Sequence, residues 1–200
     1  MKWLDPPFNM IVTGRTGCGK THYILDLLST VYRYKFNYIV IFCPTIYENT
    51  TYNRPFLDLD EGVAILPPDE VYQDLNKWLS VCGKIYGDPK CQTLFLIDDC
   101  ANLKASKTKS SELTKLAFSG RHQNISVWVL TQKYNAVVKD FRDNIKMLVM
   151  HYEKDDEALK DALRENKIIP VQDRDYVIKQ LDQGNRLVMR LLLPTEYELV

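Results

Sequence analysis

Short, continuous apolar stretches alternate along this chain with segments of helical periodicity. The stretches that we predict as strands cover 8–13, 38–43, 63–66, 93–97, 125–130, 145–151 and 187–193. Helices are predicted over 22–34, 69–81, 111–118, 155–164 and 173–181, with a short helix or turn over 134–141. Strands that are apolar on both faces are typical of a mainly parallel sheet with helices on both faces. The pattern predicts an α/β fold whose ligands bind beyond the carboxyl ends of the strands.

The segments between these elements are polar. We predict a loop over 46–60, which is rich in Asn, Thr and Asp, and a turn over 83–90. Asp69 is a candidate cap for the helix that runs to about Val81. The 200 residues contain no repeat and no linker rich in Gly, Pro or Ser, so we predict one domain, 1–200.

Charge and cysteine content narrow the class of protein. Twenty-six basic residues balance twenty-six acidic ones, so any contact with nucleic acid has to come from a local patch. No apolar run approaches the length of a membrane span, and the N-terminus does not read as a signal peptide. The five cysteines are scattered and odd in number, which indicates free thiols in a reducing compartment.

The strongest motif follows the first predicted strand and opens the first predicted helix. It has the form GxxxxGK[ST] and consists of Gly14, Arg15, Thr16, Gly17, Cys18, Gly19, Lys20 and Thr21. Its glycines allow a tight turn whose backbone N–H groups face phosphate oxygens, and the helix N-terminus adds its dipole. We expect Lys20 to bridge the β- and γ-phosphates of ATP and Thr21 to place its hydroxyl on Mg²⁺. The motif predicts a P-loop NTPase.

A second motif closes the strand predicted over 93–97. Leu94-Phe95-Leu96-Ile97 is followed by two carboxylates, Asp98 and Asp99. We expect Asp98 to hold Mg²⁺ through its water shell. Asp99 stands where many ATPases of this class have a glutamate that polarises the attacking water, and aspartate is one methylene shorter. The alternative is two acidic residues at an ordinary strand end.

Two further candidates flank the strand predicted over 125–130. Gln132 follows it, where an amide can hydrogen-bond both the γ-phosphate and the lytic water. Arg121 precedes it, and an arginine finger supplied by a neighbouring subunit is worth roughly 10³–10⁵ in rate. On position alone, the alternative interpretations are a strand-end cap for Gln132 and a surface ion pair for Arg121.

The succession GRTGCGKT, LFLIDD, GRHQNISVWVLTQ and DNIKMLVMHY resembles the FtsK/HerA superfamily of P-loop ATPases. It is most similar to the viral genome-packaging branch, typified by the poxvirus packaging ATPase. The resemblance covers about 8–152, and 153–200 forms an extension that it does not reach. The specific part is the arginine that precedes a strand ending in Thr-Gln. Asp99 in place of glutamate departs from the wider superfamily.

The resemblance implies a RecA-like (ASCE) core that hydrolyses ATP with Mg²⁺ and moves double-stranded DNA through a homo-oligomeric ring, a hexamer or a pentamer. It also implies that Arg121 acts as a finger across the subunit interface and that Gln132 acts as the sensor. A packaging motor implies a capsid vertex or portal protein as partner. Its expected location is the host cell cytoplasm or the viral assembly site, or association with the virion.

One basic segment is a candidate for DNA contact. Lys104, Lys107 and Lys109 lie among Ser and Thr residues soon after the Asp98 strand, and Lys115 follows. Such a loop facing a ring channel would contact phosphates without reading base sequence. A solvated surface loop is the alternative interpretation.

Other nucleotide-binding classes fit less well. A GTPase needs an NKxD-type guanine element after a later strand, and the sequence contains none. A nucleoside or nucleotide kinase shares the phosphate loop and the size, but 104–115 contains no arginine for a lid. Another DNA-remodelling P-loop ATPase remains an alternative. An assembly ATPase of filamentous phage normally carries a membrane segment, which the sequence does not show.

Overall fold

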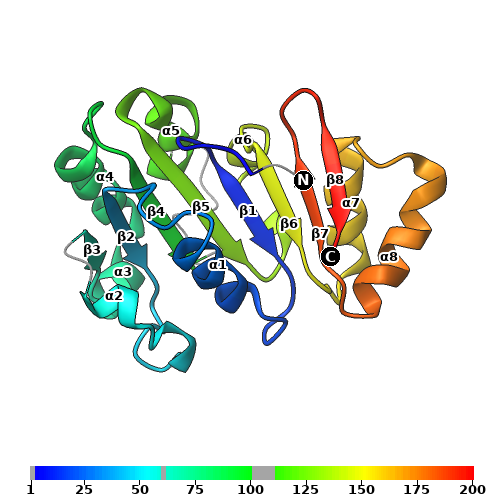
Figure 1. Ribbon diagram of the computed structural model, residues 1–200, viewed down its shortest axis with the longest axis horizontal. Helices are drawn as coiled ribbons and strands as arrows, with labels where there is room; N and C mark the ends of the chain where they lie inside the picture. The colour runs from blue at the N-terminus through cyan, green and yellow to red at the C-terminus, as the bar shows by residue number, and fades with distance from the viewer. Residues whose placement is uncertain (1–2, 60–61, 101–110) are drawn as a thin grey trace.

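The computed structural model describes residues 3–59, 62–100 and 111–200. Its centre is one eight-stranded sheet with the strand order β3-β2-β4-β5-β1-β6-β7-β8 (Figure 1). The strands are β1 (Met10–Thr13), β2 (Tyr38–Phe42), β3 (Val63–Ile65), β4 (Thr93–Asp98), β5 (Ile125–Thr131), β6 (Met147–Met150), β7 (Leu187–Arg190) and β8 (Glu196–Leu199). All neighbours from β3 to β6 pair in parallel, whereas β6–β7 and β7–β8 are antiparallel. The mainly parallel α/β sheet predicted from the sequence is confirmed.

The helices are α1 (Lys20–Ser29), α2 (Pro55–Leu59), α3 (Pro68–Gln73), α4 (Leu75–Tyr86), α5 (Glu112–Ser119), α6 (Lys139–Arg142), α7 (Asp156–Asn166) and α8 (Arg174–Asp182). Short 3₁₀ turns are η1 (Thr50–Tyr52), η3 (Gly120–Gln123), η4 (Tyr134–Ala136) and η5 (Val171–Asp173). Within the described part of the chain, no helix is long and apolar enough to cross a membrane.

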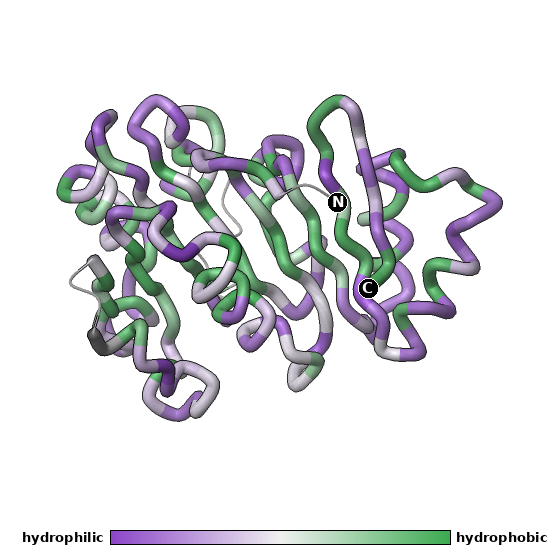
Figure 2. Tube along the Cα trace, in the orientation of Figure 1, coloured by the Kyte–Doolittle hydropathy of each residue, from purple (hydrophilic) through white to green (hydrophobic). Residues whose placement is uncertain are grey.

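The sheet is buried on both faces because its strand residues alternate between two apolar clusters. On β5, Trp128 and Leu130 pack with α1, while Val127 and Val129 pack toward the opposite face. That opposite face is covered by α3, α4 and α5 and, further along the sheet, by α7 and α8. Figure 2 shows the central strands as the most continuously apolar part of the chain. Covering both faces explains why these strands read as unbroken apolar runs rather than as alternating ones.

Three local predictions were wrong. The segment 46–60 is not simply a loop, since it contains η1 and α2. The helix predicted over 69–81 is two helices: Pro67 precedes α3, and the cap belongs to α4, where the Asp74 side chain accepts a hydrogen bond from Lys77 N. Asp69 lies in the first turn of α3 instead. The turn predicted over 83–90 begins late, because α4 continues to Tyr86.

The C-terminal strand β8 was also missed. Its sequence, EYEL, carries two carboxylates and no β-branched residue, so it lacks the apolar signal of the central strands. It forms because β7 offers a free edge, and Leu187 to Arg190 pair with Leu199 to Glu196 in antiparallel register. At the edge of a sheet, charged side chains are tolerated because they face water.

Candidate active site

The predicted motifs meet at one edge of the sheet. Thr13 at the end of β1 is in register with Thr131 of β5 and Met150 of β6. Asp98 at the end of β4 is in register with Leu130. The segments that follow these strands therefore lie side by side, as expected for the carboxyl edge of a parallel sheet.

The phosphate loop between β1 and α1 is fixed by its glycines and by its neighbours. Gly17 and Gly19 have φ of 78° and 89°, in the left-handed region that favours glycine. A Cβ on Gly14 would lie 2.7 Å from His151 Cβ. Gly14 N donates to Thr131 O at 3.2 Å and Arg15 N donates to Tyr152 O at 2.9 Å. The loop is thus held between the end of β5 and the segment that follows β6.

Lys20 begins α1 and is nearly enclosed, with 7% of its surface exposed. Its Nζ donates to Gly14 O at 2.7 Å and to Arg15 O at 3.0 Å. The ammonium therefore lies across the loop, among backbone groups that would face a bound polyphosphate. A cation at a helix N-terminus adds to the positive end of the dipole, and such a site favours anions.

Asp98 is the buried acid of the site, 3% exposed at the end of β4. Thr21 Oγ1 donates to Asp98 Oδ2 at 2.8 Å, and Tyr52 Oη donates to the same oxygen at 2.8 Å. Burial raises the pKa of the Asp98 carboxyl, while the two hydroxyl groups oppose that rise. Carboxylate and hydroxyl oxygens beside a phosphate loop suit Mg²⁺, which keeps several waters and takes few protein ligands. The donor set of Thr21 and Asp98 therefore fits that ion.

A cavity of about 470 Å³ joins these groups. It is lined by Thr16, Gly17, Gly19, Lys20, Thr21, His22, Thr45, Glu48, Asn49, Thr51, Asp98 and Asp99. Asp99 has a φ of 56° and an exposed side chain, so the chain turns sharply where β4 ends. Lys20, Thr21, Asp98 and Asp99, predicted from separate motifs, thus share one cavity.

Gln132 opens onto a different hollow, on the β6 side of the loop. This cavity of about 790 Å³ is lined by Arg15, Thr16, Gln132, Lys133, Glu153, Lys154, Asp155, Asp156 and Glu157. Thr16 lines both cavities, so the sensor candidate lies across the phosphate loop from Asp98.

Arg121 does not join the site within one chain. It lies in η3, which precedes β5, and its side chain is exposed. The seven residues of β5 separate it by about 20 Å from the carboxyl edge. Lys104, Lys107 and Lys109 lie outside the described residues, and Lys115 forms an ion pair with Glu112 on α5.

The structure adds two buried ionisable residues after β6 that the sequence analysis missed. Glu153 is 3% exposed; its Oε2 accepts from Thr13 Oγ1 at 3.2 Å, and its Oε1 has no hydrogen-bond partner among the described residues. Burial raises the pKa of Glu153 to about 7. His151 packs against Gly14, and burial, helped by the charges of Arg186 and Lys20, lowers its pKa to about 4. Their position after a central strand was the available signal.

Tyr52 and Glu48 are the other additions, and both come from the segment interpreted as a loop. Glu48 lines the cavity beside Asp98, and Tyr52 reaches Asp98 over 46 residues of sequence. No local pattern points to such a contact, because it depends on how the segment after β2 packs onto β4.

A family model and several known proteins match this sequence. The family model described as "Poxvirus A32 protein" matches residues 1–183. A DNA packaging protein of Vaccinia virus (strain Copenhagen), OPG160, is 28% identical over 176 residues, which cover 86% of this chain and 61% of that protein. The chain thus spans about three fifths of the length of that relative.

Solved structures share the fold. The genome packaging NTPase B204 from Sulfolobus turreted icosahedral virus 2, in complex with ATP-gammaS, has a TM-score of 0.65 and 16% identity, covering 98% of this chain and 97% of that one. Its complex with AMPPCP has a TM-score of 0.69 at 16% identity, covering 98% of both chains. The RecA-like P-loop fold expected from the sequence is confirmed.

Proposed function

Since the chain belongs to the Poxvirus A32 protein family, we propose that it is an ATP-hydrolysing motor that moves double-stranded DNA into a viral capsid. The observation that carries the proposal is the single cavity in which the phosphate loop, Lys20, Thr21 and the buried Asp98 meet. The proposed substrate, DNA, and the proposed role, packaging, come from relatives that are named DNA packaging proteins.

The loop residues have distinct roles in this proposal. The backbone of 14–19 cradles the phosphates, and the ammonium of Lys20 bridges the β- and γ-phosphates, exchanging its carbonyl partners for phosphate oxygens. Thr21 and Asp98, whose side chains are hydrogen-bonded to each other, are the residues that would hold Mg²⁺. The ion, when bound, neutralises charge on the phosphate oxygens.

Attack by water needs an acceptor and an orienting group. Asp99 follows Asp98 and faces the same cavity, so it is the proposed acceptor for the proton of the attacking water. Gln132 is the proposed sensor, because its neighbour Thr131 accepts a hydrogen bond from Gly14 at the start of the loop. A change at the γ-phosphate can thereby be passed to the end of β5.

In this proposal, Arg121 acts on the nucleotide bound by a second copy of the chain. It lies at the opposite end of β5 from its own phosphate loop, and an arginine side chain spans far less than the length of that strand. The proposal is therefore a homo-oligomeric ring, a hexamer or a pentamer, in which Arg121 of one subunit reaches the nucleotide of the next and stabilises charge on the transferred phosphoryl group.

Partners and location extend the same proposal. Lys104, Lys107 and Lys109 are proposed to contact DNA phosphates inside the ring, which makes binding salt-dependent and independent of base sequence. A capsid vertex or portal protein is the proposed docking partner, and the host cell cytoplasm or the viral assembly site is the proposed location. The division into a core of about 8–152 and an extension of 153–200 stays a prediction.

The function is tested by steady-state ATP hydrolysis with increasing double-stranded DNA at low and moderate salt. We expect DNA to raise the rate and added salt to remove the effect, because phosphate contacts release counterions. A parallel reaction with a mixture of nucleosides tests for phosphoryl transfer. Phosphorylation of a nucleoside without any response to DNA would establish a kinase and overturn the packaging proposal.

The shared site is tested by Arg121→Ala. We expect ATP binding to be retained and hydrolysis to fall by about 10³-fold. Mixing this variant with a Lys20→Ala variant should restore activity, because a subunit with an intact loop then meets a subunit with an intact finger. Arg33→Ala, at another exposed arginine, serves as the control. Mixed assemblies that remain inactive would contradict a finger acting between subunits.

A further inference from the structure

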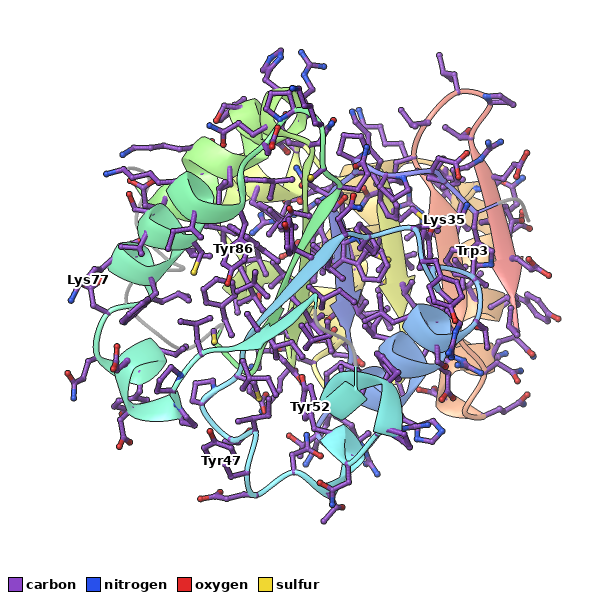
Figure 3. All side chains as sticks on the ribbon, turned by 60° about the vertical axis from the view of Figure 1, so that its left-hand side comes forward. Trp3, Lys35, Tyr47, Tyr52, Lys77 and Tyr86 are labelled. Atoms are coloured by element: carbon purple, nitrogen blue, oxygen red, sulfur yellow. The ribbon has the colours of Figure 1, made fainter. Side chains whose placement is uncertain are left out.

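Tyr52 is a buried tyrosine whose hydroxyl ends on the acid of the proposed magnesium site. It closes the η1 turn, and 6% of its surface is exposed. Figure 3 shows it inside the fold, whereas Tyr47, from the same segment, lies at the surface and is 81% exposed. The Tyr52 hydroxyl donates to Asp98 Oδ2 at 2.8 Å, a distance typical of an O–H···O hydrogen bond.

The segment that carries Tyr52 is anchored at both ends. Asn49 caps η1, its side chain accepting a hydrogen bond from Thr51 N at 3.1 Å. Two residues beyond the tyrosine, Arg54 contacts Asp26 of α1 at 3.1 Å and His22 at 2.9 Å. The turn is thus fastened to the helix that begins at the phosphate loop, and Tyr52 connects that helix to the end of β4.

The hydrogen bonds divide the carboxylate of Asp98 into two unequal oxygens. Both hydroxyl donors, Thr21 and Tyr52, end on Oδ2. Oδ1 therefore remains the oxygen for a water of the magnesium shell. Thr21 has a second task, since its oxygen is the proposed metal ligand. Tyr52 is the donor whose oxygen is not a proposed ligand of the ion, so its position need not change when nucleotide binds.

We propose that Tyr52 is a positioning residue that orients the Asp98 carboxylate for magnesium. The inference rests on the proposed function and extends it to a residue outside the two motifs. Groups that hydrogen-bond metal-site side chains fix their orientation, and losing one typically weakens metal affinity about 10–100-fold. A phenol held by a capped turn and by an ion pair to α1 is suited to that task, because its own rotamer is constrained by packing.

Tyr52→Phe tests this inference because it removes the hydroxyl and keeps the ring in the core. Binding of the fluorescent nucleotide mant-ADP is measured in EDTA and across a titration with magnesium chloride. We expect an unchanged affinity in EDTA and an increase of about 10-fold in the magnesium concentration that gives half of the metal-dependent gain. A merely structural tyrosine would change neither the midpoint nor the metal-dependent gain.

The matched control is Tyr134→Phe, since Tyr134 is also buried and its hydroxyl also has a partner, Asn166 Nδ2 at 3.2 Å, away from the cavity. It should lose stability without moving the magnesium midpoint. An unchanged midpoint in Tyr52→Phe would overturn the inference alone. Absence of metal-dependent nucleotide binding in the unaltered protein would overturn the proposed function, and the inference with it.

A second measurement covers the case in which Tyr52→Phe is too unstable to assay. Asn49→Ala leaves the ring and the hydroxyl in place but removes the cap of the turn that holds them. We expect it to raise the magnesium midpoint by about 2- to 3-fold, less than the loss of the hydroxyl itself. A midpoint equal to that of the unaltered protein would contradict positioning by this turn.

Discussion

Asp98 and Glu153 stand on the two flanks of the phosphate loop and are buried to the same degree, 3% exposed each, yet their carboxyl groups are held differently. Asp98 accepts hydrogen bonds from two hydroxyl groups on a single oxygen. Glu153 accepts one at 3.2 Å, and its other oxygen has no partner among the described residues. A buried polar group without a partner costs roughly 1–3 kcal/mol. The Asp98 carboxylate on the β4 flank is therefore held in one orientation. The Glu153 carboxyl on the β6 flank keeps a buried oxygen without a partner among the described residues, which destabilises the fold.

Two buried groups that follow β6, Glu153 and His151, make the stability of the fold depend on pH in opposite directions. Burial raises the pKa of Glu153 to about 7, so folding favours its protonated form. The stability that this provides is complete below its ordinary pKa of 4.5 and is lost as the pH rises toward 7. His151 acts in the opposite direction: its pKa is lowered to about 4, so its contribution is complete above pH 6.5 and is lost as the pH falls toward 4.

The largest effect should come from breaking the element that both flanks share. Lys20→Ala removes the ammonium that lies across the loop, and we expect ATP turnover to fall by about 10³-fold, since a preorganised positive charge at the transferred phosphoryl group is lost. Steady-state phosphate release measures it. Lys139→Ala, at an exposed ion pair with Asp143, is the control and should change little. Turnover equal to that of the unaltered protein would rule out the loop as the catalytic cradle.

A smaller effect should sharpen the comparison between the flanks. Glu153→Gln removes the ionisation from the β6 flank and keeps an oxygen that can accept from Thr13. Relative to the unaltered protein, we expect the variant to gain about 2.5 kcal/mol of stability between pH 5 and pH 8, most of it below pH 7, because the contribution of the raised pKa is lost over that range. Urea unfolding at several pH values measures the difference.

Its control is Glu157→Gln, at an exposed glutamate lining the same hollow. That change should leave the pH dependence of unfolding as it is in the unaltered protein. If Glu153→Gln also leaves the pH dependence of unfolding unchanged, the buried carboxyl is not the group that titrates between pH 5 and pH 8. The unequal hydrogen bonding of Asp98 and Glu153 would then have no measurable effect on stability.

The elements of the fold could be predicted from the sequence where burial requires a run of consecutive apolar residues. The strands β1, β2 and β6 lie inside the predicted apolar runs, and β4 and β5 extend one residue beyond theirs, since a strand covered on both faces has to be apolar throughout. Among the elements that escaped prediction, α2, η1 and β8 have polar or mixed sequences. They are held by contacts to the rest of the fold, such as the bond from Tyr52 to Asp98 and the pairing of β8 with β7.

The site divides in the same way. The phosphate loop and the two aspartates could be predicted because each belongs to a contiguous motif. The residues of such a motif are neighbours in the sequence, so its backbone conformation can be inferred from them directly. The structure brings Lys20, Thr21, Asp98 and Asp99 to one cavity. The catalytic parts assigned to Arg121 and Gln132 stay predictions, as does DNA contact by Lys104, Lys107 and Lys109.

The sequence alone determined the α/β class, the phosphate loop and the acidic strand end, because glycine conformation, helix start and strand burial are local properties of consecutive residues. Only the tertiary structure decided that Tyr52 bonds Asp98 and that Glu153 is buried behind Thr13. Both facts depend on strand order: β4 lies between β2 and β5, and β6 lies beside β1. That order brings chain segments of distant sequence to one edge of the sheet, where no spacing along the chain records their contact.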